Sequence, residues 1–163
     1  MYKKILVAVD GSPCSNVALD ESLRMASGLG AELVIVNVID NGYLKYDLGY
    51  VDMSEVRAGL IQSGQELLAE AQAKADAKHV RAHTVLVDEI LAMGDIAREL
   101  EQVVESTQAE LVVLGTHGRR GLRRMLLGSV AEGLVRQCKV PVLLVRTPPE
   151  AGEGNEEGNE EGK

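Results

Sequence analysis

The sequence predicts an α/β fold in which a doubly wound, parallel sheet of five strands has helices on both faces. Short runs of apolar residues such as 33–36 are continuous rather than alternating, as in parallel strands covered on both faces. Longer segments with helical periodicity separate these runs. With 163 residues, of which 45% are hydrophobic, the chain can bury one core without disulfides or a metal.

The first half of the chain supplies two strands and two helices. The first strand begins near residue 3, contains the apolar run 5–9, and ends at Asp10 and Gly11. Ser12 followed by Pro13 then predicts a helix start, because serine caps helices and proline is favoured at the first helical position. This helix closes at Gly30. The other elements expected here are a strand at 32–39 and a helix at about 54–78.

The second half continues the alternation of strands and helices. We expect strands at 83–87, 110–114 and 140–145, and helices at about 94–107 and 128–138. Right-handed crossovers between these strands produce a parallel sheet between two helical layers.

Two segments depart from this pattern. Residues 40–53 are long for a strand-to-helix connection and hold three of the four tyrosines, which fits either a lid over a site or a surface loop. The last fourteen residues hold six glutamates and one lysine, so −5 of the net charge of −8 belongs to this tail. We expect a nucleotide-binding domain at 1–147 and a disordered acidic tail at 148–163.

Composition excludes several function classes. The acidic balance and an aromatic content of 2% argue against nucleic acid as a partner. Cys14 and Cys138 form no CxxC motif, which favours reduced thiols in the cytoplasm. The apolar runs are far shorter than the roughly 20 residues that span a membrane. We expect a cytoplasmic protein with no membrane span.

Candidate binding residues follow the strands of the predicted sheet. Ligands of open parallel sheets bind beyond the carboxyl ends of the strands. Asp10 follows the first strand, Val38 lies near the end of the second, and the glycine-rich stretch 115–121 follows the fourth. Gly128 and Ser129 come at the start of the next helix. These residues are expected to meet at one edge of the sheet.

The stretch 115–129 has the features of a phosphate-binding loop. Its glycines allow backbone N–H groups to approach an anion, and a helix N-terminus at Ser129 favours negative charge. Arg119 and Arg120 add guanidinium groups that suit phosphate oxygens. A glycine-rich turn alone is a weak signal, and neither GxxxxGK[ST] nor GxGxxG follows any strand.

A family resemblance strengthens this interpretation. The spacing Gly115-x2-Gly118-x9-Gly128-Ser129 resembles the G-x2-G-x9-G-[S/T] signature of ATP-binding universal stress proteins. The similarity extends over residues 1 to about 147 and includes KKILVAVDGS, VNVID and LVVLGTHGRRG. Only the acidic tail lies outside it.

The resemblance implies an architecture and a ligand. It implies the strand order 3-2-1-4-5, a homodimer through the last strand, and ATP with Mg²⁺ held mainly by the phosphates. Adenine and ribose are then expected near Ala8, Val9, Asp10 and Val38. Members of the family often have proline where this chain has Ala8. The phosphates are expected at Gly115, Thr116, His117, Gly118, Arg119, Arg120, Gly121, Gly128, Ser129, Val130 and Ala131.

The function most consistent with these residues is a regulatory one. No paired carboxylates, nucleophile elbow or general base accompanies the glycine-rich stretch, which favours an ATP-binding stress-response module over an efficient enzyme. The alternative is a slow ATP-hydrolysing enzyme of the α-hydrolase type, although Asp10-Gly11-Ser12-Pro13 matches its SGGxDS loop poorly. A receiver domain that uses Asp10 and Asp88 ranks last, because its acidic pair and lysine are missing.

Overall fold

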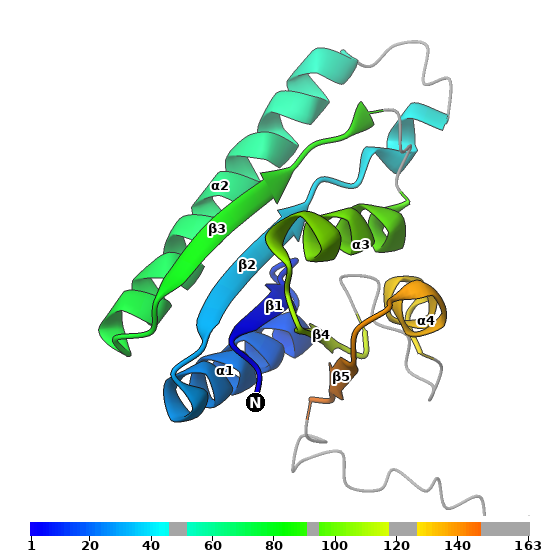
Figure 1. The fold of residues 1–163 in the computed structure, drawn as a ribbon. Helices are drawn as coiled ribbons and strands as arrows, with labels where there is room; N and C mark the ends of the chain where they lie inside the picture. The colour runs from blue at the N-terminus through cyan, green and yellow to red at the C-terminus, as the bar shows by residue number, and fades with distance from the viewer. Residues whose placement is uncertain (46–51, 91–94, 118–126, 148–163) are drawn as a thin grey trace, which may run out of the picture.

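A computed structural model describes residues 1–45, 52–90, 95–117 and 127–147. Five parallel strands form one sheet in the order β3-β2-β1-β4-β5, which confirms the predicted fold class and strand order (Figure 1). The strands are β1 (Lys4–Ala8), β2 (Glu32–Val38), β3 (Ala82–Val87), β4 (Leu111–Gly115) and β5 (Val142–Val145).

Helices cover both faces of this sheet. The helices are α1 (Pro13–Leu29), α2 (Met53–Ala77), α3 (Ile96–Thr107) and α4 (Ser129–Gln137). One apolar core lies between the sheet and α1 with α2, and a second lies between the sheet and α3 with α4 (Figure 1). The two cores take alternate residues of the central strand, because Ile5 and Val7 belong to the first and Leu6 to the second. This explains why the apolar runs are continuous.

The element boundaries follow local chemistry. Ser12 caps α1 by accepting a hydrogen bond from Ser15 N–H, Pro13 is the first helical residue, and Gly30 closes the helix with φ +63°. The last strand begins at Val142 instead of at residue 140. Pro141 has no N–H to donate, and its carbonyl oxygen accepts a hydrogen bond from Val112 N–H at 3.0 Å.

The connection from β2 to α2 contains more structure than the sequence indicated. Asn41–Lys45 form a 3₁₀ helix, η1, and Asp52 caps α2. Asn41 is fully buried and donates through Nδ2 to Asp88 Oδ1 at 3.0 Å, so η1 is fastened to the end of β3. The lid and surface-loop interpretations of 40–53 both depend on residues 46–51, which lie outside the described residues.

The strand order places a topological switch at the centre of the sheet. β1 lies between β2 and β4, so the chain leaves β1 toward one side and later returns to its other side. Crevices at such switch points are where open α/β sheets bind ligands. No helix in the described part of the chain combines the length and apolar character that crossing a membrane requires.

Candidate functional site

The end of β1 turns sharply into α1. Asp10 Oδ1 accepts a hydrogen bond from Ser12 N–H at 2.9 Å, and Gly11 between them has φ +81°. Asp10 N–H donates to Ser15 Oγ at 3.3 Å. Asp10 therefore forms an Asx-turn, in which an aspartate before glycine accepts a hydrogen bond from the backbone N–H two residues further along the chain. Its carboxylate is only half-buried and lies at the carboxyl edge of the sheet, so the turn role and a ligand role are compatible.

The end of β4 packs closely on the first turn of α1. A Cβ on Gly115 would lie 2.8 Å from Cys14 Sγ and 3.0 Å from Cys14 C, distances that leave no room for a methyl group. Thr116 N–H donates to Val145 O at 2.9 Å, and Cys14 Sγ donates to the same carbonyl at 3.2 Å. Gly115 is thus required for packing as well as for a candidate anion site.

The beginning of α4 is joined to the end of β4. Gly128 N–H donates to Thr116 O at 2.9 Å, although the two residues are twelve positions apart in the sequence. Gly128 is the N-cap and makes no side-chain hydrogen bond to the helix. Within the described residues, no N-cap side chain occupies the first-turn N–H groups of α4, and the helix dipole favours an anion at such a position. Ser129 is exposed at this end.

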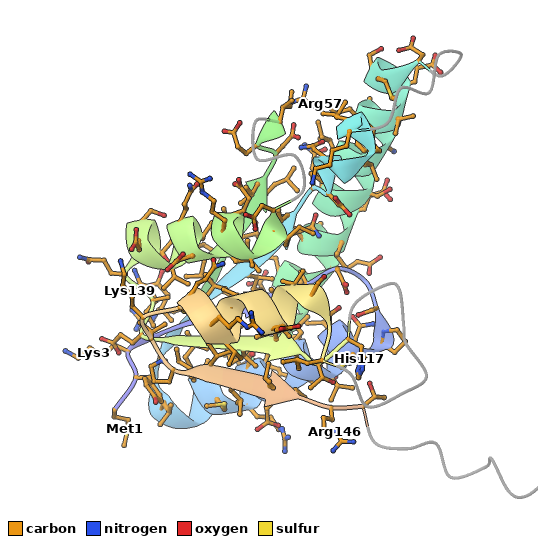
Figure 2. The ribbon with its side chains drawn as sticks, turned by 90° about the vertical axis from the view of Figure 1, so that its right-hand side faces the viewer. Met1, Lys3, Arg57, His117, Lys139 and Arg146 are labelled. Carbon is orange, nitrogen blue, oxygen red and sulfur yellow. The ribbon has the colours of Figure 1, made fainter. Side chains whose placement is uncertain are left out.

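His117 lies between these two elements. Figure 2 shows it at the opposite end of the sheet from Lys3, which precedes β1. His117 Nδ1 and Thr116 Oγ1 are 3.0 Å apart, and Nε2 is buried without a hydrogen-bond partner within the described ranges. The expectation that His117 takes part in binding rather than in acid–base chemistry stays a prediction.

The thiol of Cys14 lies beside Gly115 and Thr116, at the end of β4. Burial raises the pKa of the Cys14 thiol, but hydrogen bonds with the His117 backbone, Thr147 and the Thr116 hydroxyl together lower it by more, so the net pKa is below its ordinary value. The side chain is 6% exposed. Its sequence position gave no indication of this environment, because its neighbours come from β4 and β5.

Two polar interactions near this edge were not predicted from the sequence, one made by Asn37 and one by Asp88. Asn37, 3% exposed in β2, donates through Nδ2 to Val9 O at 2.8 Å. The available signal was one amide inside an otherwise apolar strand. At the end of β3, Asp88 is paired with Arg57 of α2 and with Asn41. Burial raises the pKa of Asp88, but these partners lower it more, so the net pKa is below its usual range.

The structure brings most of the predicted site residues to one edge of the sheet. Ala8 ends β1 and is followed by Val9 and Asp10, Val38 ends β2, Gly115 ends β4, and Ser129 begins α4. The others that are described there are Thr116, His117, Gly128, Val130 and Ala131. Gly118, Arg119, Arg120 and Gly121 lie outside the described residues. Within the described ranges, no group of three or more His, Cys, Asp or Glu side chains could hold a metal ion.

Comparison with known proteins decides the family. The model of the universal stress protein family matches residues 1–146. The chain belongs to the universal stress protein family. A universal stress protein of Methanocaldococcus jannaschii is 34% identical over 91% of this chain and 84% of its own length. The universal stress protein YxiE of Bacillus subtilis is 34% identical over 90% of this chain and its entire length.

Solved structures of universal stress proteins share the fold. One from Burkholderia pseudomallei is 34% identical, with a TM-score of 0.73 over 88% of this chain and 95% of its own. A universal stress protein in complex with cAMP is 26% identical, with a TM-score of 0.62 over 90% of this chain and 98% of its own. One from Archaeoglobus fulgidus in complex with dAMP is 19% identical, with a TM-score of 0.64 over 88% and 98%, a likeness of fold alone.

Proposed function

We propose that this universal stress protein binds an adenine nucleotide, with ATP as the preferred ligand, and acts as a nucleotide-dependent regulatory module. The observation that carries the proposal is the hydrogen bond from Gly128 N–H to Thr116 O, which sets the uncapped start of α4 against the end of β4. Free helix N–H groups beside a switch-point crevice suit a phosphate.

In this proposal the nucleotide contacts two parts of the carboxyl edge of the sheet. Phosphates lie on 115–121 and on the first turn of α4, where backbone N–H groups and two arginines supply donors. Adenine and ribose lie at the ends of β1 and β2, near Asp10 and Val38. The cAMP complex of a relative supports adenine-nucleotide recognition on this fold. In this proposal Mg²⁺ is held mainly by the phosphates.

The same proposal includes a homodimer through β5. This strand is at the edge of the sheet and pairs with β4 on one side. Its four apolar residues are half-buried, and Val135 of α4, which precedes it, is 52% exposed. An apolar edge strand is protected when a second copy covers it. Sedimentation at micromolar concentration is expected to give twice the chain mass of 17.5 kDa.

The test compares the wild-type protein with the variant Gly118→Val. Equilibrium dialysis with labelled ATP and Mg²⁺ is expected to show binding by the wild type and none by the folded variant, because a valine side chain would occupy the phosphate space. Undiminished binding by Gly118→Val would place the phosphates elsewhere. Following the label for hours separates the two functions: intact ATP supports the regulatory module, whereas steady release of phosphate supports the slow hydrolase.

A further inference from the structure

Asn37 occupies an unusual position for a polar side chain. It lies in β2, is 3% exposed, and is surrounded in sequence by buried or half-buried apolar residues. A buried amide is retained where it finds hydrogen-bond partners, because an unsatisfied one costs about 1–3 kcal/mol. Its partner is Val9 O, 2.8 Å from Nδ2, at the point where β1 ends.

The hydrogen bonds of β2 show which neighbour each backbone group faces. Glu32 N–H donates to Lys3 O on the β1 side, and Ile39 N–H donates to Val87 O on the β3 side. Because the N–H and C=O groups of successive residues in a parallel strand alternate between its two neighbours, even-numbered residues of β2 face β1. The N–H and C=O of Val38 therefore face β1.

A regular ladder would pair Val38 with the end of β1. Val9 N–H donates to Val36 O at 2.8 Å. In a regular parallel pair, Val9 O would then accept a hydrogen bond from the N–H two positions after Val36 on β2, which is the N–H of Val38. Val9 O instead accepts from the Asn37 side chain, and no hydrogen bond joins Val9 to Val38 among the described residues. The paired register accordingly ends at Ala8 and Val36.

Gly64 of α2 keeps the amide in this orientation. A Cβ on Gly64 would lie 2.6 Å from Asn37 Oδ1 and 2.8 Å from Leu86 Cδ1. The absence of a side chain at Gly64 therefore lets the amide oxygen lie against the helix while the amide nitrogen reaches Val9 O.

We infer that Asn37 is a specificity-determining positioning residue, because its amide takes the Val9 carbonyl and leaves the N–H and C=O of Val38 for the edge of a purine. The inference rests on the proposed function and deepens it. Adenine offers an acceptor at N1 beside the donor at N6, which complements one N–H and one C=O. Guanine offers the carbonyl O6 beside the donor N1–H, which is the reverse pattern, and is rejected.

Asn37→Leu removes the donor while preserving side-chain size. Val9 O then takes the Val38 N–H, the β1–β2 ladder extends by one bond, and the purine edge loses its partner. In the full chain, calorimetry is expected to show the ATP-to-GTP affinity ratio falling by about tenfold, with tripolyphosphate affinity unchanged within about twofold. The matched control is Ser22→Ala, which removes a fully buried polar group, bonded to Ala18 O at 2.8 Å in α1, and keeps the ratio.

Two further measurements keep the outcome decisive. Gly64→Ala displaces the Asn37 amide without changing it and is expected to lower the same ratio, so it replaces Asn37→Leu should that variant fail to fold. Hydrogen exchange without ligand is expected to slow at the Val38 amide in Asn37→Leu relative to its neighbours, as that amide gains a partner.

The results separate this inference from the proposed function. An unchanged ATP-to-GTP ratio in a folded Asn37→Leu or Gly64→Ala protein overturns the role of Asn37 while nucleotide binding stands. If the wild-type protein binds neither ATP nor tripolyphosphate, the proposed function is overturned instead. The hydrogen exchange of the Val38 amide then tests Asn37 by itself: slower exchange in Asn37→Leu supports its role in keeping Val38 N–H from Val9 O, and unchanged exchange overturns that role.

Discussion

The two halves of the candidate site are held together by different means. In the β1–β2 half, residues 8–10 and 37–38, side-chain hydrogen bonds fix the backbone: Asn37 binds Val9 O and Asp10 binds Ser12 N–H. In the β4–α4 half, residues 115–117 and 128–133, missing side chains allow close contact, as at Gly115 and Gly133. The first half is therefore sensitive to lost polar groups, and the second to added methyl groups.

Gly115→Ala gives the largest effect expected of a single methyl group. The new Cβ would meet Cys14 Sγ at 2.8 Å and the Cys14 backbone at 3.0 Å, and backbone cannot yield as a flexible side chain does. We expect the free energy of unfolding to fall by about 2–3 kcal/mol. Urea denaturation followed by circular dichroism measures it.

Gly28→Ala is the matched control for this substitution. Gly28 is an exposed residue of α1 whose added Cβ would have nothing within 4 Å. Alanine there is expected to raise the free energy of unfolding by about 0.5–1 kcal/mol, since glycine disfavours helix interiors. Equal destabilisation by both substitutions would mean that contact with Cys14 is not what requires glycine at 115.

Gly133→Ala tests the second close contact of the β4–α4 half. The added methyl would lie 2.7 Å from Ala97 Cβ, so α4 and α3 must separate. We expect a loss of about 1–2 kcal/mol in unfolding free energy, less than at Gly115 because two helices can shift more readily than a sheet and a helix turn. Thermal melts of Gly133→Ala beside Gly59→Ala, where nothing lies within 4 Å of the new Cβ, provide the comparison.

Asp10 distinguishes turn formation from ligand binding in the β1–β2 half. Asp10→Ala removes the acceptor for Ser12 N–H and is expected to cost about 1 kcal/mol of stability. Asp10→Asn keeps an acceptor in the same place, so stability changes little while the affinity for ATP falls, because an amide oxygen accepts a ribose hydroxyl more weakly than a carboxylate does. Equal ATP affinity of Asp10→Asn and the wild type would leave Asp10 with a turn role alone.

Asp88 gives the smallest effect and a defined pH dependence. Its pKa is lowered in the folded state, so the stability that it contributes is present above the unfolded pKa of about 4 and is lost as the pH falls through the folded value. Asp88→Asn should cost less than about 1 kcal/mol at neutral pH, since the Arg57 side chain is 40% exposed. Denaturation at pH 3 and pH 6 should show a smaller acid loss in the variant than in the wild type.

The sequence predicted the layout of the fold because its signals are local. Continuous apolar runs, Ser12 with Pro13, and Gly30 each specify a nearby backbone conformation, and the structure confirms these elements to within a few residues. Gly115 and Gly128 of the β4–α4 half were visible in the sequence for the same reason. A glycine in the sequence indicates that the backbone at its own position can adopt conformations or close contacts that a side chain would prevent.

The remaining features depend on pairs that are distant along the chain. Asn37 and Val9 are 28 residues apart, and Arg57 and Asp88 are 31 apart. Nothing in the residue types indicates which amide meets which carbonyl, because register and helix placement decide it. The contact of Gly115 with Cys14 likewise requires the position of α1 against β4. Tertiary placement, not composition, makes these residues part of the site.

Amide chemical shifts measured during an ATP titration test the site most directly. The carboxyl edge is expected to respond, at Asp10, Val38, Thr116 and the first turn of α4, while the opposite edge does not. A shallow hollow at that opposite edge provides the internal comparison, lined by Glu32, Asp76, His79, Val80, Arg81 and Ala82. Shifts confined to the carboxyl edge would support the account, and shifts gathered around the hollow, or none at saturating ATP, would contradict it.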